Sequence, residues 1–145
     1  MMVASMAFYP IFLNVSGKRA VVVGGGPVAV RKAKGLLEAG AHVVVIAPDL
    51  AAELPVEWRK RRYRTGDLKG AALAFAATND RAVNARVRSE ANSLGIPVNV
   101  ADAPEECDFL VPARIRKNGF HVAISTDGRD PAAAAKLRRK LENSL

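Results

Sequence analysis

Three small residues at fixed spacing could hold a phosphate group near the amino end of the chain. Gly24, Gly26 and Ala29 form the pattern Gly-x-Gly-x-x-Ala, a version of the fingerprint with which many proteins bind dinucleotides. The first glycine permits a tight turn, the second lets the backbone approach a pyrophosphate, and the third small residue lets a helix pack near a strand. The pattern alone is weak evidence, because similar turns join strands to helices where nothing binds.

The residues on both sides of the glycines give the pattern its context. Residues 18–23 end in an apolar, β-branched run that predicts a buried strand, and residues 43–46 predict a second one. Pro27 suits the first position of a helix, which we expect to extend to about Ala39. A helix begins with unpaired N–H groups and a partial positive charge. The segment therefore favours a nucleotide site over a plain turn.

Polar residues follow the later predicted strands as well. Thr78 and Asn79 come after residues 73–77, and Asp102 comes after residues 98–100. Ligands gather at the carboxyl ends of parallel strands, so Thr78 and Asn79 are expected to line the site. Asp49 follows the second strand and could reach a ribose; with no basic residue at that strand end, NAD is favoured over NADP.

The order of the elements predicts an α/β fold with a Rossmann-like parallel sheet over residues 1–112. Within it, Asp80 is expected to cap a helix over residues 81–94. Residues 113–124 then predict a β-hairpin with an Asn-Gly turn, followed by a helix from residue 132 to about 141. This segment, residues 113–145, is too small for an independent domain and could pack against a second copy of the chain, as a dimerisation segment.

Composition narrows the classes of protein. The chain has 145 residues and one cysteine, Cys107, so an internal disulfide is impossible and an intracellular, cytoplasmic location is expected. Residues 1–13 are apolar with no basic residue ahead of them, which favours a first strand or a packed arm over a signal peptide. We expect no metal site, because no Cys/His cluster is present, and no membrane span, because no apolar run is long enough.

The net charge of +8 favours an anionic partner: a nucleic acid, a membrane surface or a polyanionic small molecule. Part of this charge is the run Arg59–Arg62, which lies between Trp58 and Tyr63. Such interleaving is superficially typical of nucleic-acid binding, but no nucleic-acid module surrounds it. We therefore expect an edge strand over residues 56–63 that its charges protect, and we do not expect nucleic-acid binding.

Several segments, in order along nearly the whole chain, are similar to one family. Together they resemble precorrin-2 dehydrogenase, the N-terminal module of siroheme synthases. The segments that carry the resemblance are Tyr9-Pro10-Ile11-Phe12-Leu13, residues 22–32 with their three glycines, Gly40-Ala41, Ala47-Pro48, Ala76-Ala77-Thr78-Asn79-Asp80, Asn99-Val100-x-Asp102, Phe109-x-x-Pro112-Ala113 and Ala123-Ile124-Ser125-Thr126.

The resemblance implies an NAD-dependent oxidation of precorrin-2 to sirohydrochlorin, with Asp102 as the catalytic residue. It also implies a homodimer built by the hairpin and the following helix, and it gives the basic charge a reason, because the tetrapyrrole substrate is a polycarboxylate. The NAD contacts that it implies are Gly24, Gly25, Gly26, Pro27, Val28, Pro48, Asp49, Thr78 and Asn79.

Other interpretations stay open at this stage. In the loop of residues 125–131 the family usually has glycine and serine where this chain has Asp127 and Asp130. Family members also commonly continue into a further helical region, whereas this sequence stops at Leu145. Both features favour a non-catalytic NAD-binding subunit that needs a partner. Some relatives insert iron with the same aspartate, so sirohydrochlorin ferrochelatase activity is a minor alternative.

Overall fold

The computed structural model describes residues 7–145, which form two compact units. One unit is residues 11–109, and the other combines residues 110–145 with the N-terminal segment up to Pro10. The boundary predicted from the sequence lies after residue 112, with the N-terminal residues in the first region. Residues 7–10 therefore belong to the second unit.

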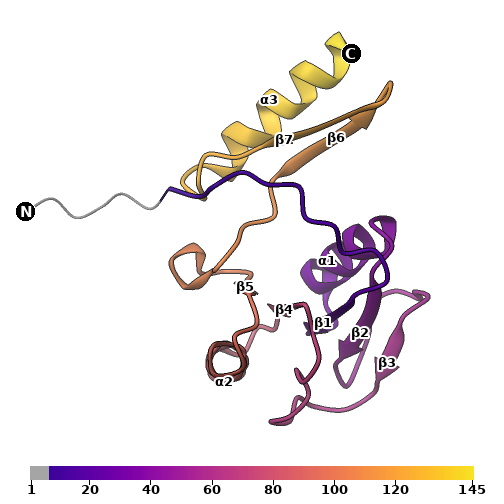
Figure 1. Ribbon diagram of the computed structural model, residues 1–145, viewed down its shortest axis with the longest axis vertical. Helices are drawn as coiled ribbons and strands as arrows, with labels where there is room; N and C mark the ends of the chain where they lie inside the picture. The colour runs from indigo at the N-terminus through magenta and orange to yellow at the C-terminus, as the bar shows by residue number, and fades with distance from the viewer. Residues whose placement is uncertain (1–6) are drawn as a thin grey trace, which may run out of the picture. The chain divides into compact units, whose positions relative to one another are not determined.

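The unit of residues 11–109 is built on a five-stranded parallel sheet with the strand order β3-β2-β1-β4-β5 (Figure 1). The predicted α/β, Rossmann-like fold is confirmed. The strands are β1 (Arg19–Val23), β2 (His42–Ile46), β3 (Glu57–Arg59), β4 (Leu73–Ala76) and β5 (Val98–Val100).

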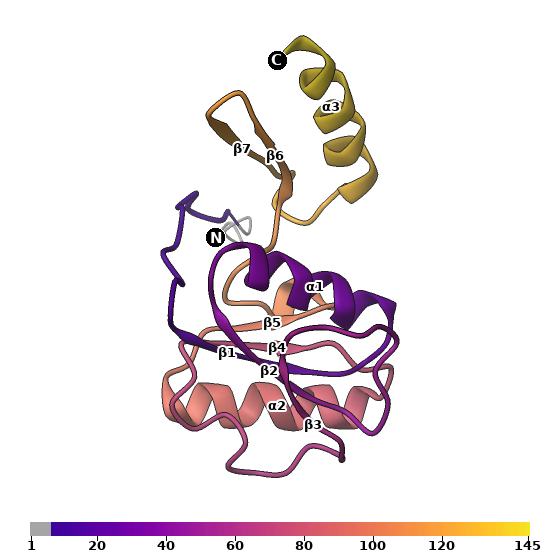
Figure 2. The same cartoon turned by 90° about the vertical axis from the view of Figure 1, so that its right-hand side faces the viewer.

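Two helices cover the opposite faces of this sheet. Helix α1 (Pro27–Glu38) lies on one face and helix α2 (Arg81–Leu94) on the other (Figure 2). Strands enclosed on both sides must be apolar along their whole length. This explains why β1 and β2, after their first residues Arg19 and His42, and all of β4 consist of buried aliphatic or aromatic residues.

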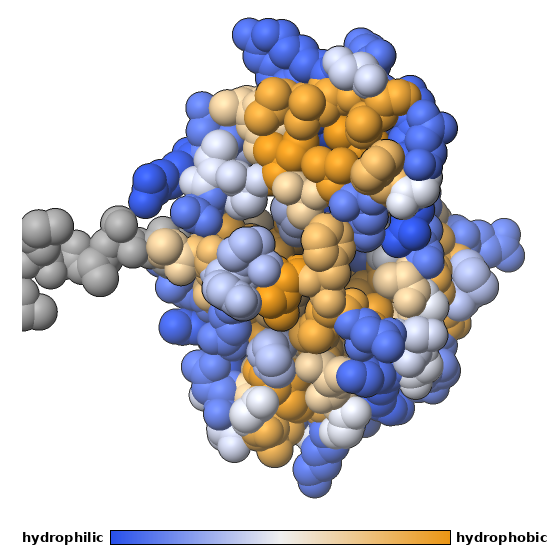
Figure 3. Space-filling view, turned by 45° about the horizontal axis from the view of Figure 1, so that its top comes forward, coloured by the Kyte–Doolittle hydropathy of each residue, from blue (hydrophilic) through white to orange (hydrophobic). Residues whose placement is uncertain are grey.

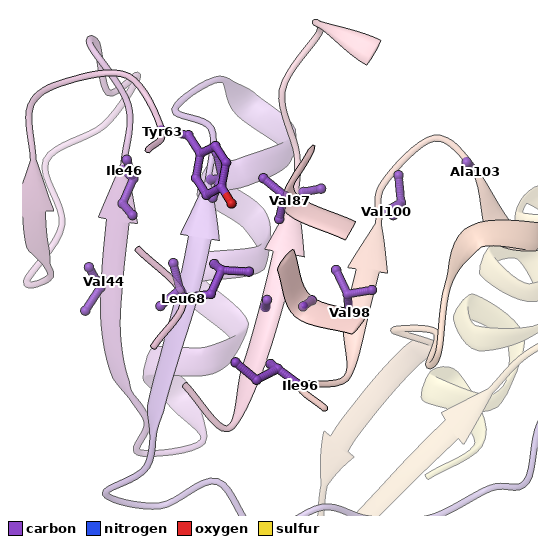
Figure 4. Close-up of a cluster of buried hydrophobic side chains, with 14 residues drawn as sticks. Val44, Ile46, Tyr63, Leu68, Val87, Ile96, Val98, Val100 and Ala103 are labelled. Carbon is purple, nitrogen blue, oxygen red and sulfur yellow. The ribbon is translucent and has the colours of Figure 1, made fainter. Parts of the chain in front are cut away.

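One cluster of buried side chains joins α2 to the sheet (Figure 4). Val87 and Ala91 of α2 pack against residues from four strands, among them Val21, Val44 and Val98. Tyr63 and Leu68, from the segment between β3 and β4, complete the cluster. Burial of these side chains supplies the main stabilisation of the unit, and it fixes α2 against the sheet.

The register of the sheet places four strand ends in one row. Val23 of β1 pairs with Ile46 of β2 on one side and with Ala76 of β4 on the other. Ala76 in turn pairs with Val100 of β5. The chain therefore leaves four neighbouring strands at one edge of the sheet, and the residues that follow them face the same region.

Strand β3 is at the edge of the sheet, as predicted, but it is shorter than the predicted residues 56–63. The reason is Asp67, whose carboxylate accepts two hydrogen bonds from the Arg61 guanidinium and one from the Arg64 N–H. These bonds turn the backbone away from the sheet after Arg59. Two arginines of the basic run are therefore paired with carboxylates of the same chain. Arg61 pairs with Asp67, and Arg59 pairs with Glu57.

In the second unit, β6 (Ala113–Lys117) and β7 (Phe120–Ile124) form the predicted antiparallel hairpin, followed by helix α3 (Pro131–Ser144). Asn118 and Gly119 both have positive φ, as a two-residue hairpin turn requires. Asp130 caps α3 by accepting a hydrogen bond from the Ala133 N–H. The Lys117 Nζ and the Asn118 amide bond carbonyl groups near the carboxyl end of α3 and hold helix and hairpin together.

This unit buries little apolar area of its own. Ile115 and Ala134 are its buried side chains, whereas Phe120, Leu137 and Leu141 are exposed. An apolar patch is visible over this unit (Figure 3). A small unit with bulky apolar side chains in contact with water is typical of a surface that meets another protein.

The N-terminal segment differs from its prediction. From residue 7 to residue 15 it forms neither helix nor strand, and Tyr9, Ile11 and Phe12 are well exposed. The expected first strand is therefore wrong for these residues, because the segment joins no sheet, whereas the alternative of an arm agrees with the hydrogen bond from the Phe8 N–H to Asp127. Residues 1–6 of that expectation lie outside the described residues. Over residues 7–145, the structure holds no helix long and apolar enough to cross a bilayer.

Candidate functional site

The glycine turn between β1 and α1 contains three glycines in three different surroundings. A Cβ on Gly24 would lie 2.4 Å from the Ala77 carbonyl oxygen, and its φ of +132° disfavours any other residue. A Cβ on Gly25 would lie 1.8 Å from the Asp49 carbonyl oxygen. A Cβ on Gly26 would meet no heavy atom within 4 Å. The first two glycines thus permit packing within the chain, and the third faces open space.

The open space at Gly26 lies at the amino end of α1. Gly26 is the N-cap of this helix, Pro27 follows it, and no described side chain caps the helix. By contrast, the Asp80 carboxylate caps α2 by accepting hydrogen bonds from the N–H groups of Ala82 and Val83. An uncapped helix end with room beside it suits an anionic group. The residues present therefore fit the pyrophosphate of a dinucleotide.

The loop after β2 contacts the glycine turn directly. The Ala51 N–H donates a hydrogen bond of 2.8 Å to the Gly25 carbonyl oxygen. At the strand end itself, the Trp58 indole donates a bond of 2.9 Å to the Ala47 carbonyl oxygen. Pro48 and Asp49 are exposed between these two fixed points. The structure thus brings Asp49 next to the turn, as a residue for a ribose would require.

The chain after β4 is ordered by a buried amide that the sequence analysis did not single out. Asn84 is fully buried in α2, and its Oδ1 accepts bonds from the Thr78 hydroxyl at 2.7 Å and the Thr78 N–H at 3.2 Å. Its Nδ2 donates to the Thr78 carbonyl oxygen at 3.1 Å. This network fixes Thr78 and leaves the next residue, Asn79, exposed. A polar residue on the apolar side of an amphipathic helix was the available signal.

Asp102 lies on the turn after β5, and its side chain is 58% exposed. Its Oδ1 is 3.2 Å from a terminal nitrogen of Arg81, the first residue of α2. The other terminal nitrogen of Arg81 bonds Glu106, in the short 3-10 helix η1 (Pro104–Glu106). Hydrogen bonding to Glu106, which outweighs desolvation, and the charges of both carboxylates raise the pKa of Arg81.

The turn that carries Asp102 rests on Cys107. The Val100 N–H donates to the Cys107 sulfur at 3.1 Å, and the thiol lies 3.2 Å from the Val100 carbonyl oxygen and 3.4 Å from that of Ala103. Burial raises the pKa of the Cys107 thiol, and the bond from Val100 opposes this only in part. The thiol is therefore a structural group in its protonated form, not an activated nucleophile.

The predicted site residues thus fall into four groups along one sheet edge, one after each of four neighbouring strands. Asp49 follows β2, the glycine turn follows β1, and Thr78 and Asn79 follow β4. Asp102 follows β5, two strands away from the glycine turn, which is roughly 10 Å at ordinary strand spacing. Within residues 7–145, no group of three or more His, Cys, Asp or Glu side chains could hold a metal ion. An elongated ligand could therefore lie along this edge, with the Asp102 carboxylate near one of its ends.

Comparison with known proteins identifies the family. Residues 11–113 match the family model described as "Putative NAD(P)-binding". In the solved structure of SirC, a precorrin-2 dehydrogenase, the fold matches with a TM-score of 0.80 at 30% sequence identity, over 95% of this chain and 71% of that one. This chain belongs to the NAD(P)-binding family of precorrin-2 dehydrogenase.

Curated relatives of this precorrin-2 dehydrogenase family member are longer proteins. The chain is 42% identical to the siroheme synthase of Azotobacter vinelandii and 44% identical to that of Pseudomonas aeruginosa, each over 144 residues. In both comparisons the match covers 94% of this chain and 31% of the relative. The chain therefore spans about a third of the length of these relatives.

Proposed function

We propose that this chain oxidises precorrin-2 to sirohydrochlorin with NAD as the hydride acceptor. The observation that carries the proposal is the position of Asp102, a carboxylate on the same sheet edge as an open, uncapped dinucleotide turn. The likeness to precorrin-2 dehydrogenase and to siroheme synthases supports the choice of substrate.

The proposed NAD site follows the row of strand ends. Gly24, Gly25 and Gly26, with Pro27 and Val28, hold the pyrophosphate at the amino end of α1. Pro48 and Asp49 hold the adenosine ribose, while Thr78 and Asn79 line the nicotinamide side, toward β5. NAD is preferred to NADP because the Asp49 carboxylate would repel a 2′-phosphate. Arg59, which pairs with Ile46 at the end of β2, would not offset this repulsion, because its guanidinium is already paired with Glu57 and Asp67.

Asp102 is proposed to take the proton. Bound NAD supplies the acceptor for one hydride, that is, one hydrogen with both electrons of its bond. The oxidation removes two hydrogens from the macrocycle, so the second leaves as a proton, and the Asp102 carboxylate accepts it. The exposed position of Asp102 suits this role, because the proton can then pass to water.

The remaining proposals concern partners and location. A polycarboxylate tetrapyrrole suits the net charge of +8. Phe120, Leu137 and Leu141 are proposed to be covered in a homodimer, because exposed apolar patches favour association. The absence of disulfide pairing, with one cysteine in the sequence, supports a cytoplasmic location.

The two unusual acids of the loop have structural roles that reduce the case for a non-catalytic subunit. Asp130 caps α3, and Asp127 Oδ1 accepts a hydrogen bond from the Phe8 N–H at 3.4 Å. Asp127 also adopts a positive φ of 58°, a conformation that aspartate tolerates better than most residues. Each acid therefore has a structural role within the second unit.

An anaerobic assay with enzymatically generated precorrin-2 and NAD tests the proposal. We expect NADH and the sirohydrochlorin spectrum to appear together. Asp102→Ala should abolish turnover and leave NAD binding intact, because Asp102 is remote from the glycine turn. Confirmed NAD binding by the wild type without turnover would contradict the proposal and favour the non-catalytic subunit.

A further inference from the structure

The Asp102 carboxylate is held by a side chain from the neighbouring strand–helix joint. Arg81 begins α2 directly after its cap, and one terminal guanidinium nitrogen lies 3.2 Å from Asp102 Oδ1. The other terminal nitrogen bonds a carboxylate oxygen of Glu106. A single planar guanidinium therefore joins two carboxylates that belong to the segment after β5.

The exposure of the two carboxylates shows which one anchors the arginine. The Glu106 side chain is 18% exposed, whereas the Asp102 side chain is 58% exposed. The hydrogen bond to Glu106 is also the main cause of the raised pKa of Arg81. Glu106 thus fixes the guanidinium, and the guanidinium contacts the more exposed carboxylate of Asp102.

We propose that Arg81 is a positioning residue for Asp102: it holds the carboxylate in the orientation that accepts the proton, and Glu106 anchors it. This inference rests on the proposed dehydrogenase function. A half-exposed aspartate on a turn has little packing to select one rotamer, so a fixed partner restricts it. Proton transfer depends on such orientation, because a misplacement of about 1 Å can cost roughly a hundredfold in rate.

If Arg81 only supported the fold, its loss would lower the unfolding temperature. Ion pairs between exposed side chains contribute little to the stability of a fold. Arg81 is itself half-exposed, so its loss should leave the unfolding temperature unchanged. A large effect on turnover without an effect on stability would therefore separate positioning from structural support.

The test compares three variants of the full chain with the wild type. Arg81→Met should lower kcat by about tenfold to a hundredfold, with KM for precorrin-2, NAD affinity and Tm unchanged. Arg81→Lys should recover part of the loss, because an ammonium can still reach one carboxylate. Arg88→Met is the matched control: it removes the same charge from the same helix, about 10 Å further along the axis, and should behave as wild type.

A double-mutant cycle sharpens the test. In an Asp102→Asn background, Arg81→Met should cause no further loss of the residual rate, since the group that it positions is already gone. An unchanged kcat in Arg81→Met would overturn the inference and leave the dehydrogenase function standing. A raised KM with unchanged kcat would overturn it too, by showing that Arg81 contacts the substrate instead. If the wild type has no turnover, the proposed function fails and the positioning role fails with it.

Discussion

The amino ends of α1 and α2 lie at the same edge of one sheet, yet among the described residues a side chain caps α2 and none caps α1. The end of α2 is closed by the Asp80 carboxylate, with the Thr78–Asn84 network behind it. The end of α1 has no side-chain cap among the described residues, and open space lies beside Gly26. The difference supports the proposal that the joint between β1 and α1 is the ligand site, because no described side chain satisfies its N–H groups.

The glycine turn itself repeats this contrast on a smaller scale. Gly24 and Gly25 are required because the backbone around Ala77 and Asp49 approaches them too closely for a side chain. Gly26 is not required by any contact within the chain. The fold therefore requires glycine at positions 24 and 25, whereas at position 26 it leaves space for the proposed pyrophosphate, so substitutions at the three positions should have different consequences.

The largest effect is expected for Gly25→Ala. Its Cβ would lie 1.8 Å from the Asp49 carbonyl oxygen, so the loop after β2 must move and the bond between Ala51 and residue 25 must break. We expect the free energy of unfolding to fall by about 3 kcal/mol. Urea unfolding measures it, with Gly26→Ala as the control that should unfold like the wild type. Equal stability of the two variants would break the contrast within the turn.

A smaller effect is expected for Asn84→Ala. The substitution leaves the N–H and hydroxyl of Thr78 without their buried partner, which should cost about 2 kcal/mol of unfolding free energy. Because Thr78 lines the proposed nicotinamide side, NAD affinity should fall as well. The matched control is Asn92→Ala, an exposed asparagine of the same helix. If both variants lose the same stability, the Thr78–Asn84 network does not order this strand end.

Asp80→Ala should have a still smaller effect on stability and none on NAD binding. Loss of an N-cap carboxylate costs about 1 kcal/mol, and Asp80→Ser should restore most of it. Thermal unfolding and NAD titration of the same samples measure the two quantities. A loss of NAD affinity comparable to that of a glycine-turn variant would show that the end of α2 also holds the dinucleotide.

The smallest effect is expected for the reactivity of Cys107, which supports the turn between β5 and η1. Because burial raises its pKa, less thiolate is present at neutral pH in the folded protein than in the unfolded one. Alkylation at pH 8 should be at least about tenfold slower in the native protein than in urea, and should accelerate as the pH rises. Equal rates would mean that the thiol is exposed and does not support the turn after β5.

Much of the fold follows from local signals in the sequence. Helix α2 was predicted with its observed bounds, because Asp80 caps its amino end and Gly95, at a φ of 68°, closes its carboxyl end. The hairpin was predicted for the same reason, since an Asn-Gly pair favours the two positive φ angles of its turn. Residues at the ends of parallel strands could be assigned to one edge without knowledge of any contact.

The side-chain and loop contacts that complete the site could not be predicted from the sequence. Arg81 and Asp102 are 21 residues apart, and their approach depends on the pairing of β4 with β5 and on side-chain reach. The packing of Gly25 beneath the Asp49 carbonyl depends on the path of a loop. β3 ends early because Arg61 meets Asp67, a side-chain contact that strand propensity does not contain.

The most direct test of the account is to close the end of α1 as the chain closes the end of α2. Gly26→Asp places a capping carboxylate where the pyrophosphate is proposed to bind, in a backbone conformation that aspartate adopts freely. Calorimetric titration with NAD, with Tm measured on the same samples, should show a variant at least as stable as the wild type that binds NAD about a hundredfold more weakly or not at all. Wild-type NAD affinity in this variant would contradict the account, because the open end of α1 would then not be the dinucleotide site.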